Sequence, residues 1–164
     1  MSNKTFRKGY TIIISTQAYA KLNNIMLDNI YSKKARYDKL MVMKDISNGK
    51  KTRPIVIIWE NKDCDRFIAA PMTTSNSKYN QKNAFYNKKN LKKITYWKFD
   101  PLVLKKNSTP INGYFEKWDD ELIKEFLDDW KNRNNMKKSY QYLKGKINEL
   151  KVETYEKMLK IEKK

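Results

Sequence analysis

The sequence predicts a single α+β domain in which a small antiparallel sheet comes first and a pair of helices follows. Two observations lead to this fold class. Residues 54–59 and 66–70 are short runs rich in β-branched and aromatic residues, separated by a charged segment, which is typical of a β-hairpin. From residue 119 onward the apolar residues recur instead with the period of amphipathic helices. A chain of 164 residues is long enough for one compact core.

The hairpin is the strongest single prediction. Residues 60–65 are charged and form its turn, where Cys64 is expected to lie near solvent. Pro71 is expected to end the second strand, because proline has no amide proton to donate to a central ladder. Antiparallel pairing brings the basic residues before the first strand beside the hydroxyl residues after the second. The basic residues are Lys50, Lys51 and Arg53, and the hydroxyl residues are Thr73, Thr74 and Ser75, with Lys78 just beyond. Cations beside hydroxyls at one rim of a small sheet are suited to hold and cut a phosphodiester.

Further elements are expected on both sides of the hairpin. Residues 10–14 form a candidate strand, after which Ser15 or Thr16 caps a helix that begins near Tyr19. Residues 40–43 are a second candidate strand, and the sequence leaves open which of the two opens the sheet. One more strand is expected over residues 94–104, ending near residues 100–101, and a loop over residues 110–115.

Two helices are expected to complete the chain. The first runs from Asp119 and Asp120 to about residue 134, and the second bears an apolar seam that continues to Ile161. The predicted single domain therefore spans residues 1–164, with a barrel core at about 40–115 and a helical tail at about 119–162.

The charge of the chain indicates a polyanionic partner. The formal net charge is +18, which favours nucleic acid first and an acidic protein second. The absence of histidine excludes histidine acid–base catalysis and histidine-ligated metals, and the single cysteine excludes an internal disulfide and a cysteine zinc site. We therefore expect no metal and no cofactor. No apolar run is long enough to span a membrane, so a cytoplasmic protein is expected.

Residues 66–99 are the part of the chain best suited to RNA. This stretch has no acidic residue, and aromatic residues lie among its lysines, as single-stranded RNA binding requires. Phe67, Phe85 and Trp97 are expected in the core. A second basic, aromatic segment lies at residues 31–39. The candidate RNA-binding residues are Tyr19, Lys33, Lys34, Arg36, Tyr37, Lys50, Ser75, Tyr79, Lys82, Lys88, Lys89, Lys92 and Lys93.

The hairpin also resembles a known family. Arg53-Pro54 followed by four aliphatic residues, and a return strand that closes in Pro71-Met72-Thr73-Thr74, resemble the MazF/PemK/Kid ribonuclease toxins. Together with the Tyr-Thr-Ile strand near the N-terminus, the chain also resembles ToxN and CptN, the toxins of type III toxin–antitoxin systems that act in phage defence. The resemblance implies an SH3-like, half-open antiparallel β-barrel of the MazF/Kid kind, with five to seven strands. Three to four helices would decorate it, including a C-terminal helical pair.

The resemblance also implies roles for single residues. Thr73 matches the active-site threonine of the family, and Thr74 the hydroxyl residue after it. Arg53 matches the catalytic arginine of MazF-like members, whereas Lys51 is the nearest match to the lysine that ToxN-like members use, and the choice stays open. Lys78 resembles the lysine that trails the hydroxyl cluster, although the spacing here is longer than in ToxN.

The function implied is a metal-independent endoribonuclease toxin that cuts mRNA to leave 2′,3′-cyclic phosphate and 5′-OH ends. Its inhibitor would be a repeated structured antitoxin RNA, expected to form pseudoknots, within a hetero-oligomeric protein–RNA assembly. One alternative is a MazF/PemK-like mRNA interferase neutralised by an acidic protein antitoxin. The other is an RNA-binding module that does not cleave.

Overall fold

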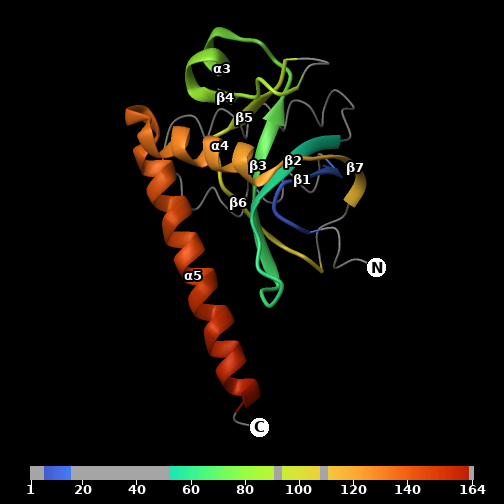
Figure 1. Ribbon diagram of the computed structural model, residues 1–164, viewed down its shortest axis with the longest axis vertical. Helices are drawn as coiled ribbons and strands as arrows, with labels where there is room; N and C mark the ends of the chain where they lie inside the picture. Colours follow the sequence, from blue (N-terminus) through green and yellow to red (C-terminus); the bar gives the residue numbers. More distant parts are fainter. Residues whose placement is uncertain (1–5, 16–51, 91–93, 108–110, 163–164) are drawn as a thin grey trace.

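The computed structural model describes residues 6–15, 52–90, 94–107 and 111–162. These residues form a seven-stranded antiparallel sheet and three α-helices, so the α+β class is confirmed (Figure 1). In chain order the elements are β1 (Tyr10–Ser15), β2 (Thr52–Trp59), β3 (Arg66–Thr73), α3 (Lys78–Asn83), β4 (Ala84–Tyr86), β5 (Tyr96–Lys98), β6 (Leu102–Lys105), β7 (Ile111–Lys117), α4 (Asp120–Asn132), the 3-10 turn η2 (Asn134–Met136) and α5 (Lys137–Glu162).

The sheet is open within the described residues. Its strand order is β4-β5-β3-β2-β1-β7, and β6 pairs with β3 outside this path. Strands β4 and β7 therefore lie at opposite ends of the order. The N-terminal strand β1 is central, because it pairs with β2 on one edge and with β7 on the other. The sheet thus begins at Tyr10, N-terminal to the predicted barrel core, while the candidate strand at 40–43 lies outside the described residues.

The predicted hairpin is confirmed, but its second strand continues beyond the predicted end. Strands β2 and β3 pair antiparallel across a turn at residues 60–65, and β3 runs through Pro71 to Thr73. On the other edge of β3, pairing with β6 ends at Ala69 and pairing with β5 begins at Met72. Pro71 falls between these two ladders. The missing amide of a proline is tolerated where a ladder is interrupted, which explains why Pro71 does not end the strand.

Two other predictions about the sheet are wrong. The expected single strand over residues 94–104 is two short strands, β5 and β6, because the chain leaves β3 at Phe99 and rejoins it at Leu102. A loop was expected at residues 110–115, but from Ile111 onward this segment is strand β7, which pairs with β1 along most of its length. Cys64 was expected near solvent but is only 5% exposed, because the turn folds its side chain into the core.

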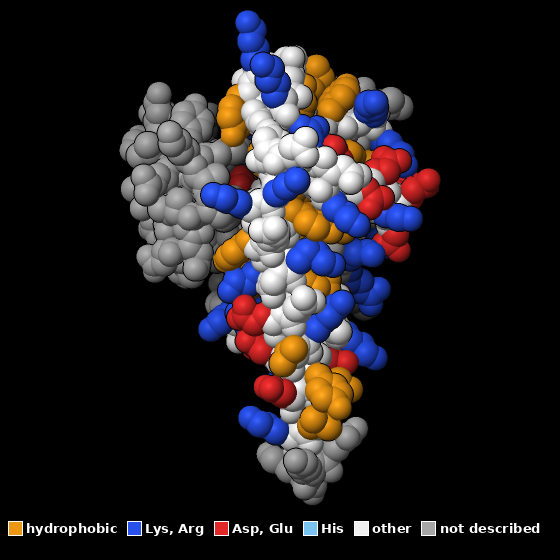
Figure 2. Space-filling model, turned by 90° about the vertical axis from the view of Figure 1, so that its left-hand side faces the viewer, with side chains coloured by type: hydrophobic (Ala, Val, Ile, Leu, Met, Phe, Trp, Pro, Cys, Tyr) orange, Lys and Arg blue, Asp and Glu red, His pale blue; other side chains and the backbone are white. Residues whose placement is uncertain are grey.

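The C-terminal helical pair is confirmed. Asp119 caps α4 by accepting a hydrogen bond from the amide of Leu122 at 2.8 Å, as N-cap carboxylates do. Helix α5 runs beside the sheet and ends beyond the turn of the β2–β3 hairpin (Figure 1). On the side of the molecule formed by α5, many lysine and arginine side chains are exposed, and apolar side chains gather at the C-terminal end of the helix (Figure 2). Its predicted seam is buried at Leu143 and Leu150 but exposed at Met158 and Ile161.

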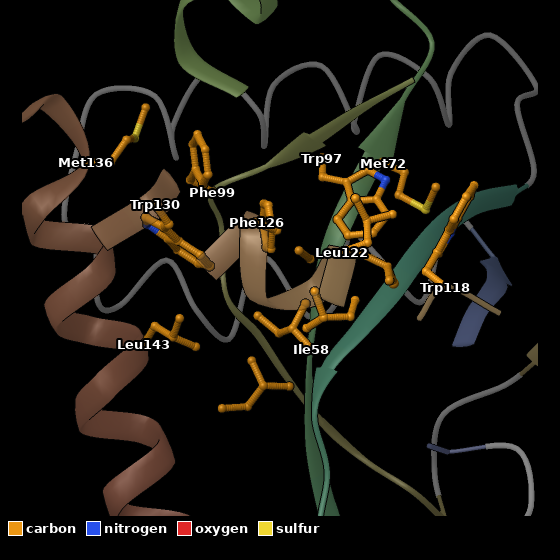
Figure 3. Packing of buried hydrophobic residues seen from close by; sticks show 14 of the residues in the cluster. Ile58, Met72, Trp97, Phe99, Trp118, Leu122, Phe126, Trp130, Met136 and Leu143 are labelled. Carbon is orange, nitrogen blue, oxygen red and sulfur yellow. The ribbon is translucent and has the colours of Figure 1, made fainter. Parts of the chain in front are cut away.

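One face of the sheet packs against these helices. The core on this side contains alternate residues of the strands, including Ile58 and Met72, with Leu122 and Phe126 from α4 (Figure 3). Phe126 lies at its centre, with its ring stacked at 5.3 Å on Phe99 and edge-on to Trp97 at 5.4 Å. Such aromatic contacts add to the apolar area that the helix buries.

The intervening residues of the same strands form a second core on the opposite face. This cluster includes Ile12, Ile55, Ile57 and Phe67, all fully buried. Because side chains alternate along a strand, odd-numbered residues of β3 face the second core and even-numbered residues face the helices. This alternation decides the direction in which the site residues at the end of β3 point.

Candidate functional site

The end of β3 is the point at which the predicted hydroxyl residues meet other strands. Thr73 is the last residue of β3 and lies directly opposite Tyr96 of β5, which in turn lies opposite Tyr86 of β4. Residues directly opposite each other in an antiparallel sheet share a face. Thr73, Tyr96 and Tyr86 therefore form a row across three strands, which we call the cross-strand row. The neighbouring row, Met72, Trp97 and Phe85, points the other way, into the core under α4.

A short polar loop follows the row and leads into α3. We call residues 73–77 the hydroxyl loop. The Thr73 hydroxyl accepts a hydrogen bond from the Ser75 amide at 3.1 Å, and Ser77 caps α3 by accepting from the Asn80 amide at 3.1 Å. The Asn80 side chain, 7% exposed, donates to the Ser75 carbonyl at 2.8 Å. Hydrogen bonds from both ends thus hold the loop, while Thr74 and Ser75 keep their side chains exposed.

The cross-strand row supports this loop directly. The Tyr96 phenol donates a hydrogen bond of 2.6 Å to the side-chain oxygen of Asn76, and Gln81 donates to the same oxygen at 3.2 Å. Tyr96 itself is 5% exposed. The hydroxyl loop is therefore tied to the sheet through one buried phenol, and its first residue, Thr73, is half-buried.

Three of the predicted cations are exposed close to this loop in the chain. Lys78 and Lys82 lie on α3, and Lys88 lies in the turn after β4. None of the three forms an ion pair with an acid among the described residues. Lys89 differs, because its ammonium lies 3.8 Å from a carboxylate oxygen of Asp119. The exposed amines of α3 and the β4 turn are thus available to phosphate groups.

The turn that holds Lys88 is itself well defined. Asn87 is fully buried. Its backbone N–H donates to the Thr95 carbonyl at 2.9 Å, and its side-chain oxygen accepts from the Lys89 backbone amide at 3.0 Å. The side-chain amide of Asn90 donates to the Thr95 hydroxyl at 2.7 Å. These bonds keep the turn against β5.

The two strands also place Arg53 in relation to Thr73. Ile55 lies opposite Pro71, and continuing this register by one pair on the same face brings the Arg53 backbone opposite Thr73. On its other edge, Arg53 pairs with Ile14 of β1. The β2–β3 hairpin thus has the basic residue at the start of one strand and the hydroxyl residue at the end of the other. Lys50 and Lys51 lie outside the described residues.

Several other candidates also fall outside the described part of the chain. The helix expected after residue 16 and the basic segment at 31–39 are among them, as are two lysines after β4. These candidate residues are Tyr19, Lys33, Lys34, Arg36, Tyr37, Lys92 and Lys93. Tyr79 is described and is 42% exposed on α3.

Sequence reasoning missed three residues that shape the site. Asn76 was not singled out, and Tyr86 and Tyr96 were counted only among the aromatic residues of the 66–99 stretch, because their importance depends on pairing between strands that the sequence does not reveal. The one signal in the sequence is the Tyr96-Trp97 pair, whose two rings must face opposite sides of a strand.

An arginine from the helical tail holds α3 and β4 in place. The Arg133 guanidinium donates to the carbonyl oxygens of Lys82 and Ala84, pairs with Asp129 at 3.0 Å, and lies 5.0 Å from the centre of the Phe99 ring. These contacts join the C-terminal end of α4 to the segment that bears the exposed lysines.

The groups with perturbed pKa values lie away from this site. The hydrogen bond to Glu153 raises the pKa of the Arg66 guanidinium above its ordinary value, and this pair ties the start of β3 to α5. Burial raises the pKa of Tyr142 on α5.

Within the described residues, no group of three or more acids and cysteines is arranged to hold a metal ion. Among those same residues, no helix has the length and apolar character needed to cross a membrane.

The comparisons with known proteins add no family to this geometry. No family model matches the chain, and no curated protein matches it.

Proposed function

We propose that this protein is a metal-independent endoribonuclease toxin of the ToxN/CptN kind, with the end of β3 as its active site. The observation that favours this most is the meeting of the hydroxyl loop with the cross-strand row. There, Thr73 lies opposite Tyr96 of β5, and continuing the β2–β3 register beyond Ile55 and Pro71 would bring the Arg53 backbone to its other side. Exposed hydroxyls beside exposed lysines are the groups that a scissile phosphate needs.

The proposed reaction is attack of a ribose 2′-oxygen on the adjacent phosphorus. The P–O5′ bond breaks as the new O2′–P bond forms, which leaves a 2′,3′-cyclic phosphate. The proton lost by the 2′-hydroxyl goes to a base, and the departing 5′-oxygen takes up a proton to become a hydroxyl. In this proposal Thr73 and Thr74 contact the phosphate and the 2′-hydroxyl. A cation, either Arg53 or Lys51, stabilises the negative charge that develops on the phosphorane oxygens, and Lys78 adds to it.

The net charge of +18 supports a nucleic-acid inhibitor, the repeated structured antitoxin RNA. The register also supports the MazF-like alternative, because its continuation beyond Ile55 and Pro71 would bring the Arg53 backbone opposite Thr73. The two branches differ in the partner that accompanies the protein in its native operon. Purification from that operon should yield a discrete RNA of uniform length, which nuclease degrades only after the complex is denatured. A small acidic protein in its place would favour the MazF-like branch.

Cleavage itself is tested with the purified, RNA-free protein and a long transcript in the presence of EDTA. We expect cuts at defined positions, with cyclic phosphate at one new end and hydroxyl at the other. Thr73→Val should abolish them and Thr73→Ser should retain most of the activity, because serine keeps the hydroxyl. Lys78→Ala should slow cleavage, because it removes a positive charge that stabilises the phosphorane. The matched control Lys131→Ala, which removes an exposed lysine at the end of α4, should not.

Two outcomes would contradict the proposal. A wild-type protein that binds the transcript but leaves it intact would be a non-catalytic RNA-binding module. Unchanged cleavage by Thr73→Val would place the active site elsewhere.

A further inference from the structure

We propose that the exposed ring of Tyr86, packed beside Tyr96, is a binding site for one unpaired nucleobase of the RNA whose phosphate lies at Thr73. This inference rests on the proposed RNA-binding function and adds a base-recognition site to it. It concerns a side chain that the reaction at Thr73 does not itself require.

The outer face of the Tyr86 ring takes no part in packing the sheet. Phe85 is the residue of β4 that packs into the core, with its ring 5.7 Å from Trp97 and 5.5 Å from Phe126. Tyr86 therefore points to the opposite side of the sheet and is 44% exposed. Its only ring contact among the described residues is with Tyr96, at a centroid distance of 5.5 Å. An aromatic ring with one supported side and one open side can stack a base.

The supporting ring is held rigidly. Tyr96 is 5% exposed, and its hydroxyl is committed to Asn76 by the 2.6 Å hydrogen bond. The Tyr86 ring, tilted by 33° from that of Tyr96, thus rests on a fixed neighbour. A binding ring that is already ordered loses little conformational entropy when its ligand arrives.

The position of Tyr86 suits a nucleotide close to the one that is cut. Thr73 and Tyr86 flank Tyr96 on the same face, so the two outer residues lie two strand spacings apart, roughly 10 Å. Lys88 lies two residues after Tyr86 in the sequence and is exposed, so its ammonium can neutralise a phosphate of the bound RNA. Stacking on this ring requires a flat aromatic base and does not depend on the sugar that carries it.

The experiment measures binding without cleavage. The probe is a short, fluorescein-labelled single strand of 2′-O-methyl RNA, which lacks the attacking hydroxyl, and affinity is followed by fluorescence anisotropy at fixed salt. We expect Tyr86→Leu to weaken binding by about 5-fold to 150-fold, because a stacked base contributes roughly 1–3 kcal/mol. Tyr86→Trp and Tyr86→Phe should bind as tightly as the wild type.

Two controls separate stacking from other effects. Tyr155→Leu removes an equally large ring, 64% exposed, from the C-terminal end of α5, which lies at the opposite end of the molecule from α3 and β4 (Figure 1). It should leave the affinity unchanged. A probe of the same length with abasic sugars should bind wild type and Tyr86→Leu equally, because there is no base to stack. Thermal melts of each variant show whether it is folded.

The outcomes are distinct from those of the cleavage test. Equal affinity of folded Tyr86→Leu and wild type for the base-containing probe overturns the inference, even if the protein cleaves RNA at Thr73. Equal weakening on the abasic probe also overturns it, because the ring would then act on the backbone. Loss of affinity confined to the base-containing probe supports the site, even if no cleavage is found.

Discussion

Gly9 and Gly145 show how differently two glycines can contribute to one fold. Gly9 precedes β1 with a φ of +94°, and a Cβ atom built there would collide with the carbonyl oxygen of Trp118. Its amide and carbonyl also bond Ile57 and Trp118, at 2.8 and 2.7 Å. Gly145 lies inside α5 with open space around it.

We therefore expect opposite effects of the same substitution. Gly9→Ala should lower the free energy of unfolding by more than about 2 kcal/mol, because it combines backbone strain with a steric clash. Gly145→Ala should raise it by about 0.5–1 kcal/mol, because alanine favours a helix over the unfolded chain more than glycine does. Urea unfolding followed by tryptophan fluorescence measures both. A destabilised Gly145→Ala would show that α5 has a neighbour at this point that the structure does not describe.

Arg133 is a second residue with a strong predicted effect. Its side chain is half-buried and bonds two backbone carbonyls of the segment that bears Lys82. Arg133→Ala leaves Asp129 and those carbonyls without this donor, so we expect a loss of about 2–3 kcal/mol in unfolding free energy. The exposed neighbour Lys131→Ala should change it by less than about 0.5 kcal/mol. Equal effects of the two variants would contradict the role given to Arg133.

At the scale of elements, α5 divides into a packed part and a projecting part. Leu143, Leu150 and Thr154 are buried, whereas Met158 and Ile161 are 46% and 65% exposed. Removal of residues 157–164 should thus change the free energy of unfolding by less than about 1 kcal/mol, since little buried surface is lost. Leu150→Ala should cost about 2–5 kcal/mol, because it leaves a cavity between α5 and the sheet. A truncation as costly as Leu150→Ala would mean that the projecting part is covered in solution, and sedimentation of the full chain would then test for a second copy.

At the scale of the whole molecule, the net charge of +18 opposes the compact state. Raising the salt from 0.01 M to 0.1 M shortens the Debye length from about 30 Å to about 10 Å and screens this repulsion. We expect Tm of the nucleic-acid-free protein to rise by about 2–4 °C, equivalent to roughly 1 kcal/mol for a chain of this size. The affinity for single-stranded RNA should fall over the same range, because releasing the counterions of the RNA into more concentrated salt gains less entropy. Calorimetry and anisotropy measure the two effects, and a Tm that falls with salt would contradict the first.

The sequence alone determined the elements whose signal is local. The β2–β3 hairpin follows from two apolar runs around a charged turn, and α4 from a helical period behind the capping residue Asp119. The basic and hydroxyl residues at the hairpin ends were likewise visible, because the antiparallel register follows from a short turn.

The tertiary structure decided what depends on partners far along the chain. Asn112 and Gly113 have little preference for a strand, and β7 forms because β1, about a hundred residues earlier, offers its free edge. Pro71 stays within β3 because, on the edge of β3 away from β2, pairing with β6 has ended and pairing with β5 has not yet begun. The cross-strand row arises in the same way. Tyr86 and Tyr96 face Thr73 only because β4, β5 and β3 pair in one register, and a shift by a single residue would turn all three side chains to the opposite face.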